Sequence, residues 1–313
     1  IGIAAPLGWG GARGFRLGGQ SNVIDYFDIQ NSGNATDFGD IGGAGSNQSG
    51  GQVSNASRIV SALGFSQYSG SYVYEDQMQY ITSSTTGNAQ NFGNLTSGRG
   101  QNFGCSNGTR GVFMGGYAQG GSIVNTIDYI TIANTGDATD FGDLYAYGSY
   151  DARQKAAVVS GSTRGVACGG GDNGYGATNH MQYITIATAG NALDFGDLTR
   201  NVAHTSGCSD FTRGIIMGGS RETGGTGNLD DTIDYFTVDT TGNAADFGNL
   251  TYTSQGAGAS SDGTYGCHYG GYGGSFAEVN TIDRVTVQTL GNAADHGDLT
   301  NTNGLYHQGA SGN

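Results

Sequence analysis

A pattern of 19 residues that recurs six times constrains this chain more than any other feature. Each copy resembles TIDYITIANTGDATDFGDL at residues 126–144. The central aromatic position of the copies is occupied by Phe38, Phe92, Phe141, Phe195, Phe247 and His296. Neighbouring copies lie 49 to 54 residues apart. A period of this length indicates an array of structural units, because each unit buries its apolar face only against its neighbours.

The Asp140-Phe141-Gly142 triplet in this pattern is also the magnesium-binding triplet of protein kinases. A kinase needs one such triplet, together with a VAIK-like lysine and an HRD loop. This chain has a single lysine, Lys155, outside any VAIK-like context, and it has no HRD loop. We therefore interpret the triplet as part of a structural repeat.

Each repeat is predicted to form four short strands. A segment of small residues comes first, and a second segment, such as TRGVFMGG at residues 109–116, ends in glycines. The third strand alternates Ile127 and Tyr129 on one face with Asp128 and Ile130 on the other, as a half-buried strand does. The TGNA step favours a tight hairpin to the fourth strand, TDFGDL. No segment has a capped helical period, so we expect very little helix.

Four strands in about 50 residues with a double-glycine signature are typical of a kelch-type propeller blade. WD40 repeats are shorter and carry a GH…WD signature, whereas the only tryptophan here, Trp9, lies outside the repeats. We predict an all-β, six-bladed kelch-like β-propeller over residues 12–313, with four antiparallel strands per blade. A seventh copy of the motif, which a seven-bladed ring requires, is absent.

The two ends of the chain are expected to meet. The N-terminal repeat begins at its second strand, whereas the C-terminal GLYHQGASGN resembles the missing first strand. We therefore predict that the C-terminal strand joins the N-terminal blade and brings Ser311 near Arg13, which removes exposed sheet edges. Residues 1–11 are predicted to form an N-terminal arm. This arm is either a surface flap or a joint to another subunit or an upstream domain.

Composition excludes several partners. The formal net charge is −14, and an acidic surface repels nucleic-acid phosphates and anionic membranes. No apolar run approaches the roughly 20 residues that span a bilayer. Nucleic-acid binding and membrane insertion are therefore not expected. The four cysteines form no CxxC pair and are predicted to be small buried thiols. They are Cys105, Cys168, Cys208 and Cys267.

The connections between the second and third strands vary from repeat to repeat, while the turns at the opposite end barely change. Divergent loops on a repeated scaffold suggest a binding face. Aromatic rings beside Asn, Asp and Gly suit polar ligands such as sugars; the alternative is that these rings only pack the loops. The candidate ligand-binding residues are Tyr68, Tyr72, Tyr74, Tyr117, Tyr175, Arg221, Tyr272 and Phe276.

Other residue groups give weaker signals. Aspartate pairs such as Asp37/Asp40 and Asp140/Asp143 could bind calcium, but their recurrence at a hairpin favours turn hydrogen bonds. The repeated arginines, which blade 6 replaces with Tyr265, are expected to satisfy nearby turn carbonyls or carboxylates. The histidines lack HxxxH or HExxH spacing, and no GxSxG occurs. We therefore predict no metal, no cofactor and no catalytic residue.

The string TIDYITIATxGNAxDFGDLT, preceded by TRGVxxGG, resembles kelch-like repeat proteins of tailed, marine-type bacteriophages. The resemblance covers about residues 12–300, and blade 6 departs from it with Arg284 and His296. It implies a non-enzymatic virion structural protein, exposed on the particle for host-surface attachment or for assembly of a tail fibre or spike. The implied partners are other virion proteins and a host cell-surface glycan. The alternatives are a purely architectural decoration protein and, less favoured, a polysaccharide-degrading enzyme.

Overall fold

The chain was analysed as a computed structural model that describes residues 11–18, 21–42, 50–68, 71–145, 155–171, 176–221, 228–274, 277–302 and 309–312. Over these ranges the chain forms 29 strands and no helix, so no described helix is available to cross a membrane. The all-β prediction is therefore confirmed.

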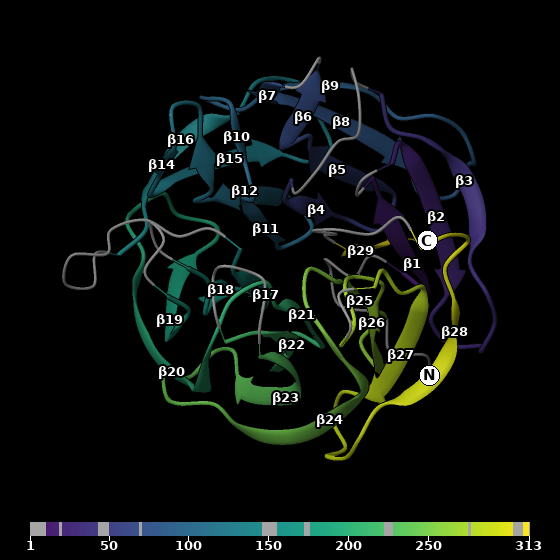
Figure 1. The fold of residues 1–313 in the computed structure, drawn as a ribbon. Coiled ribbons are helices and arrows are strands. Elements are labelled where there is room, and N and C mark those ends of the chain that lie inside the picture. The colour runs from purple at the N-terminus through teal and green to yellow at the C-terminus, as the bar shows by residue number, and fades with distance from the viewer. Residues whose placement is uncertain are drawn as a thin grey trace, which may run out of the picture.

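Most described strands belong to six antiparallel sheets of four strands, numbered here along the chain (Figure 1). Sheet 1 contains β29 (Gly309–Gly312), β1 (Arg13–Leu17), β2 (Val23–Asp28) and β3 (Thr36–Asp40). Sheet 2 contains β4 (Gln52–Ser54), β5 (Arg58–Ala62), β8 (Gln77–Thr82) and β9 (Gln90–Asn94). Sheet 3 contains β11 (Phe103–Ser106), β12 (Arg110–Met114), β15 (Thr126–Thr131) and β16 (Thr139–Asp143).

The other three sheets repeat the same strand order. Sheet 4 contains β17 (Ala157–Ser160), β18 (Arg164–Cys168), β19 (Thr178–Thr185) and β20 (Leu193–Val202). Sheet 5 contains β21 (Ser206–Ser209), β22 (Arg213–Ser220), β23 (Leu229–Thr237) and β24 (Ala245–Ser254). Sheet 6 contains β25 (Gly258–Ser261), β26 (Tyr265–Tyr269), β27 (Thr281–Thr286) and β28 (Ala294–Asp298).

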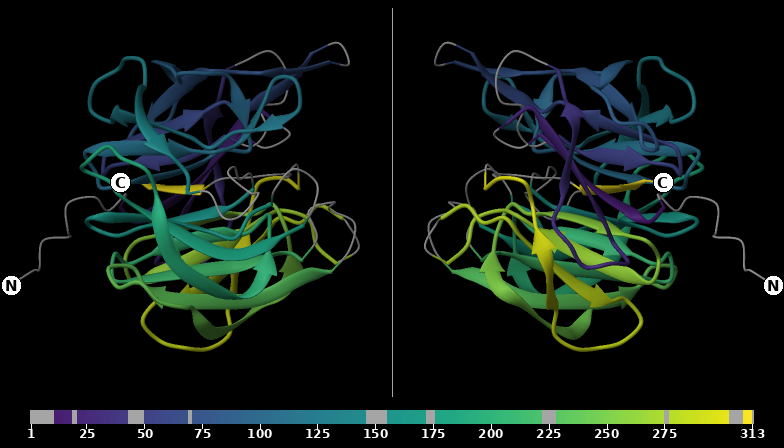
Figure 2. Two further views of the ribbon diagram at one scale, coloured as in Figure 1. Left: turned by 90° about the vertical axis from the view of Figure 1, so that its left-hand side faces the viewer. Right: turned by 90° about the vertical axis from the view of Figure 1, so that its right-hand side faces the viewer.

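Two smaller sheets among the described residues correct the expectation that each repeat contributes four strands and nothing else. One is a hairpin of β6 (Phe65–Tyr68) and β7 (Ser71–Tyr74). The other joins β10 (Arg99–Gly100), β13 (Tyr117–Ala118) and β14 (Ser122–Ile123). The hairpin and the β13–β14 pair lie in connections between second and third strands, and β10 lies in the link from sheet 2 to sheet 3. Each of these segments occurs in one repeat only, so the repetition does not reveal them. Figure 2 shows the hairpin standing out from the body of sheets in profile.

The first strands of the six sheets lie around a common centre (Figure 1). These strands contact one another in order: β4 contacts β11, β11 contacts β17, β17 contacts β21, β21 contacts β25, and β25 contacts β29. The last of them, β29, contacts β4. Small residues permit this approach. A Cβ placed on Gly104 of β11 would lie 2.7 Å from the carbonyl oxygen of Gln52 in β4, so a larger side chain would push the two strands apart.

The C-terminal strand pairs with the N-terminal strand, as expected from the sequence. β29 is antiparallel to β1, with Ser311 opposite Gly14 and Gly312 opposite Arg13. The first strand of sheet 1 therefore comes from the end of the chain and its other three strands from the beginning. This pairing joins the two termini of the described fold by backbone hydrogen bonds.

Apolar clusters fill the spaces between neighbouring sheets. Between sheets 1 and 2, for example, Phe15 and Phe38 pack with Ile59 and Ile81, and all four are buried. The phenylalanine of the repeated motif also meets the tyrosine of the same sheet edge to face, as Tyr129 and Phe141 do with ring centroids 6.0 Å apart. All four cysteines are buried free thiols, as predicted.

Candidate binding face and the contacts that support it

The repeated GNA turn bonds each sheet to the sheet before it. Between sheets 1 and 2, the N–H of Gly87 donates to the carbonyl of Phe38 at 2.9 Å, and the N–H of Ala89 donates to the carbonyl of Asp40 at 2.8 Å. The side-chain Oδ1 of Asn88 accepts from the N–H of Asp40 at 3.0 Å. This three-bond contact, which we call the GNA contact, explains why the motif is repeated.

The GNA contact is present at all six junctions between the described sheets, including the junction of sheet 6 with sheet 1. There, the N–H groups of Gly33 and Ala35 donate to the carbonyls of His296 and Asp298, and Asn34 Oδ1 accepts from the N–H of Asp298 at 3.1 Å. The glycine of the DFG triplet is required by this geometry. A Cβ on Gly297 would lie 2.3 Å from the carbonyl oxygen of Gly33.

The second aspartate of each pair lies in this contact. The hydrogen bonds at Asp40 and Asp143 use the backbone N–H and carbonyl of these residues and join two sheets, where we expected side-chain hydrogen bonds within the hairpin. Where Asp137 replaces the asparagine, its carboxylate accepts from the N–H of Asn94 at 2.9 Å. Among the described residues, no group of three or more His, Cys, Asp or Glu side chains has the geometry of a metal site.

The repeated arginines each stack on the tyrosine of their own sheet and most also donate to the next sheet. Arg110 lies 4.2 Å from the centroid of Tyr129, and its Nη1 donates to the carbonyl of Ile186 in the following repeat. The same two contacts occur for Arg13, Arg58 and Arg213. The expectation that these side chains satisfy carbonyls is therefore confirmed for these four, and the stacking is an addition that the sequence did not indicate.

Sheet 6 makes the same pair with the two residues exchanged. Tyr265 occupies the arginine position of β26, and Arg284 occupies the tyrosine position of β27. The Arg284 guanidinium still lies over the Tyr265 ring, 4.4 Å from its centroid. Its Nη1 donates to the carbonyls of Ile29 and Gln30 in sheet 1. Two departures that seemed independent in the sequence therefore compensate each other.

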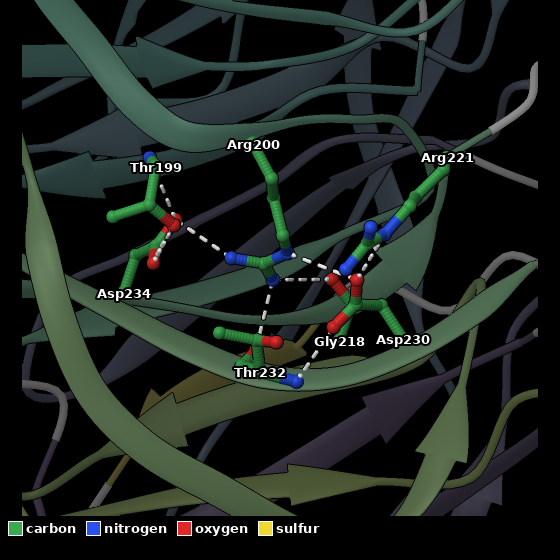
Figure 3. Close-up of polar contacts among 7 residues, drawn as sticks. All are labelled: Thr199, Arg200, Gly218, Arg221, Asp230, Thr232 and Asp234. Atoms are coloured by element: carbon green, nitrogen blue, oxygen red, sulfur yellow. Dashed lines mark hydrogen bonds and ion pairs between the residues drawn. The ribbon is translucent and has the colours of Figure 1, made fainter.

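A buried acid or amide in the third strand of each sheet binds the chain leaving the previous sheet. Asp234 is one of these residues, and Figure 3 shows its surroundings. Its carboxylate accepts from the hydroxyl of Thr199 at 2.6 Å and pairs with Arg200 at 2.6 Å. Arg200 also donates to the carbonyls of Gly218 and Thr232, so one guanidinium ties β20 to β22 and β23.

The residue that leaves each sheet varies with the side chain that accepts from it, which is an aspartate or a glutamine in the third strand of the next sheet. Where the third strand has an aspartate, a threonine hydroxyl donates to it, as Thr96 does to Asp128. Where it has a glutamine, the amide oxygen accepts only from a backbone N–H, as Gln182 does from Tyr145. The remaining pairs follow the same rule: Thr300 with Asp25, Thr251 with Asp283, and Gly42 with Gln79.

Burial changes the ionisation of these groups. Desolvation raises the pKa of Asp25, while the neighbouring Arg16 opposes this shift at a distance of 2.5 Å. Desolvation also raises the pKa of Asp234, and Arg200 opposes it. Burial raises the pKa of Asp283, and the hydrogen bonds from Thr251 oppose this shift; at the position equivalent to Arg200, the repeat before Asp283 has Tyr252. These carboxylates serve the junctions between sheets.

A buried serine–histidine arrangement lies between sheets 5 and 6. His268 Nδ1 is 2.7 Å from Ser206 Oγ, and Nε2 is 2.6 Å from Ser254 Oγ. Serine beside histidine is also a nucleophile–base pair in hydrolases. Here, however, the histidine is 1 % exposed, and burial lowers its pKa to about 3. A neutral, enclosed imidazole with both nitrogens occupied has no access to a substrate, so we assign it to packing.

The described parts of the links between second and third strands, and of the links from each fourth strand to the next sheet, lie at the same end of the sheets, called the loop face here. Backbone pairing joins the two kinds of link at three places: Gly100 with Tyr117, Ala203 with Ser220, and Gln255 with Tyr272. The loop face therefore has a hydrogen-bonded base, as a rigid binding surface requires.

The structure brings only part of the candidate set together. Tyr175 and Phe276 lie outside the described residues. Tyr68 and Tyr72 lie in β6 and β7, where the backbone is described but the side chains are not. Tyr74 and Tyr117 meet with ring centroids 5.7 Å apart, although 43 positions separate them in the sequence.

The other two described candidates belong to other sheets. Arg221 follows β22 in sheet 5, and its Nε donates to Asp230 at 2.8 Å while 59 % of its side chain stays exposed (Figure 3). Tyr272 follows sheet 6's β26, and burial together with a hydrogen-bonded Glu278 raises its pKa. These two residues are therefore attached to local acidic partners, separate from the Tyr74–Tyr117 pair.

One residue of the aromatic group was missed. Phe65 is 8 % exposed, and its ring centroid lies 5.9 Å from that of Tyr74. It directly follows the glycine-ending segment of repeat 2, where the sequence SRIVSALG departs from the double glycine. That departure was the available signal that the connection forms a structure of its own.

Comparisons with known proteins add no relative. No protein-family model matches the chain, and no curated protein matches it. The repeat and its contacts therefore carry the functional argument.

Proposed function

We propose that the six sheets are the blades of a kelch-like β-propeller that the C-terminal strand closes. Three observations support this: the cycle of contacts among the first strands, the pairing of β29 with β1, and the GNA contact at every described junction, sheet 6 to sheet 1 included. Closure of this kind removes exposed edges at the two ends of the sheet array.

We further propose that the protein is a non-enzymatic virion structural protein whose loop face attaches the particle to a glycan on the host surface. The observation that carries this is the contrast between the two parts of the repeat. The GNA and arginine–tyrosine contacts recur from sheet to sheet, whereas the loop face differs in every repeat and carries added sheets over sheets 2 and 3. A rigid scaffold that presents divergent connections is suited to recognition.

The acid–base groups of the scaffold support a non-enzymatic role. The buried arginine–aspartate pairs serve the scaffold: Asp25, which pairs with Arg16 of its own sheet, accepts from Thr300 of the chain leaving sheet 6, and His268 is enclosed between two serines. These groups are engaged in the fold. The resemblance of the repeat sequence to bacteriophage proteins supports three further parts of the proposal. These are a phage origin, a place on the virion surface and contact with other virion proteins.

The test is binding of the purified chain to a panel of bacterial envelope polysaccharides and to whole cells. We expect saturable binding to at least one envelope glycan, with no change in the glycan's length after incubation. Shortened chains would contradict the non-enzymatic proposal. Incorporation into particles without binding to any envelope component would contradict attachment and favour the architectural alternative.

A further inference from the structure

We propose that Tyr74 and Tyr117 form a subsite for an uncharged sugar ring. The inference rests on the proposed attachment function, because it assigns a place on the loop face and a ligand class to it. Its first support is geometric: two tyrosines from different repeats meet at 5.7 Å between ring centroids, with 42° between the ring planes. Both residues are only partly buried, so each keeps some surface available to a ligand.

Phe65 packs against Tyr74 and supports the pair of tyrosines. Phe65 is nearly buried and lies 5.9 Å from Tyr74, with 46° between the planes. The β6–β7 hairpin places Phe65 directly opposite Tyr74. Phe65 is therefore a support rather than a contact surface, and the accessible ring area belongs to the two tyrosines.

Backbone contacts fix the two tyrosines relative to each other. At the base of the hairpin, the N–H of Glu75 donates to Gly64 at 2.8 Å, and the N–H of Arg99 donates to Glu75 at 3.2 Å. β10 then pairs Gly100 with Tyr117. A rigid aromatic surface loses little conformational entropy on binding, which favours affinity.

Glycines in β10 and just before it allow the hairpin to lie against this strand. A Cβ on Gly98 would lie 2.2 Å from the carbonyl oxygen of Tyr74, and a Cβ on Gly100 would lie 2.4 Å from the Phe65 ring. Larger residues at either position would separate Tyr74 from Tyr117. The sequence of this connection is therefore specifically suited to bringing the two rings together.

The turn that follows Tyr117 is open at Gly120 and comes close to the ring hydroxyl at Gly121. Gly120 and Gly121 have φ values of 93° and 92°, which glycine readily adopts. A Cβ on Gly120 would meet no atom within 4 Å, and one on Gly121 would lie 3.3 Å from the Tyr117 hydroxyl. Gln119 in the same turn is exposed and supplies an amide.

This combination fits the two surfaces of a sugar. The C–H face of a hexose stacks on an aromatic ring, while its hydroxyls bind amide and hydroxyl groups at the edge of the site. The Tyr117 hydroxyl and the exposed Gln119 provide such an edge.

The acidic residues near the two tyrosines favour an uncharged sugar over an anionic one. Glu75 and the exposed Asp76 directly follow Tyr74, and the nearby cation Arg99 is fully buried and paired with Asp128 at 2.9 Å. An anionic sugar would therefore meet repulsion without a compensating cation.

The test measures binding of neutral oligosaccharides to the full chain and to Tyr74→Ala, Tyr117→Ala and the double variant. We expect each single substitution to weaken binding about tenfold and Tyr117→Phe to weaken it less, because stacking is retained. Leu290→Ala is the control: Leu290 is an exposed apolar residue, 53 % accessible, in the turn between β27 and β28, at the opposite end of the sheets from the loop face. Circular dichroism on heating establishes that every variant is folded.

The outcomes separate this inference from the proposed function. If the wild-type chain binds cells and a neutral glycan but the tyrosine variants bind equally well, the subsite is wrong and attachment stands. Stronger binding of sialylated, uronic or amino sugars would overturn the neutral class. If the wild-type chain binds neither cells nor any glycan, both the subsite and the attachment function fail.

Discussion

Arg284 stacks over Tyr265 with the two residues exchanged between strands relative to the other stacked pairs. In sheet 3, for example, the arginine begins the second strand and the tyrosine lies in the third; in sheet 6, the tyrosine begins β26 and the arginine lies in β27. The Arg284 guanidinium donates to the carbonyls of Ile29 and Gln30 of the next sheet, as Arg58 donates to those of Ile132 and Ala133 in the usual arrangement. The junction of sheets 6 and 1 therefore keeps the arginine–tyrosine stacking and the hydrogen bonds to carbonyls, although the two residues have exchanged positions.

This exchange predicts a rescue. Arg284→Ala should lower the free energy of unfolding by about 1–3 kcal/mol, because the stacking and two carbonyl contacts of a partly buried arginine are lost. Arg284→Tyr should destabilise similarly, whereas Arg284→Tyr combined with Tyr265→Arg should recover part of the loss. Urea unfolding of the four proteins measures this. A double variant no more stable than Arg284→Tyr alone would contradict the compensation.

The GNA contact predicts that two glycines facing each other differ in their tolerance of a methyl group. Gly297→Ala should be strongly destabilising, by about 2 kcal/mol or more, because its Cβ would lie 2.3 Å from the carbonyl oxygen of Gly33. Gly33→Ala is the control, since a Cβ there meets no atom within 4 Å. Thermal unfolding compares the two, and equal effects would show that the close approach is not what requires Gly297.

The buried acids predict different responses to the same substitution. Asp234→Asn removes the nearer of the two carboxylates paired with the buried Arg200, at 2.6 Å, and leaves Asp230 at 3.4 Å, so it should cost about 1.5–3 kcal/mol. Asp283→Asn removes a charge that burial already disfavours, and the amide oxygen can still accept from Thr251. We therefore expect a much smaller loss of stability at Asp283. Denaturant midpoints measured at pH 7 decide the matter, and the reverse order would contradict the role of Arg200.

His268 predicts a contribution to the pH dependence of stability. Burial lowers its pKa from 6.5 in the unfolded chain to about 3 in the fold. Below pH 6.5 the unfolded chain binds a proton that the folded chain does not, so this residue reduces stability as pH falls from about 6.5 to about 3, by about 1.4 kcal/mol per pH unit. His268→Gln should therefore lose less stability than the wild type between pH 7 and pH 5. Parallel pH profiles of the two proteins would contradict this.

The regular part of the fold could be predicted because the same sequence pattern occurs in six repeats. Repetition revealed the four strands of each sheet, and the incomplete first repeat indicated that β29 pairs with β1. The small sheets could not be predicted, because each connection occurs once and is short. Tyr74 and Tyr117 were both identified as candidates, but nothing in one sequence indicated that their rings would meet. Comparison among the repeats could have revealed the Arg284–Tyr265 exchange and the threonine–aspartate pairs.

The threonine–aspartate and backbone–glutamine pairs give the repeats an order. Each pair spans two successive repeats, as Thr96 with Asp128 and Tyr145 with Gln182 do. A repeat that ends with threonine is matched to a successor with aspartate, and one that ends with glycine or tyrosine is matched to a successor with glutamine. An exchange between the two types of repeat would place a buried carboxylate beside a donor that cannot fully satisfy it, so the order of the repeats is tied to these pairs.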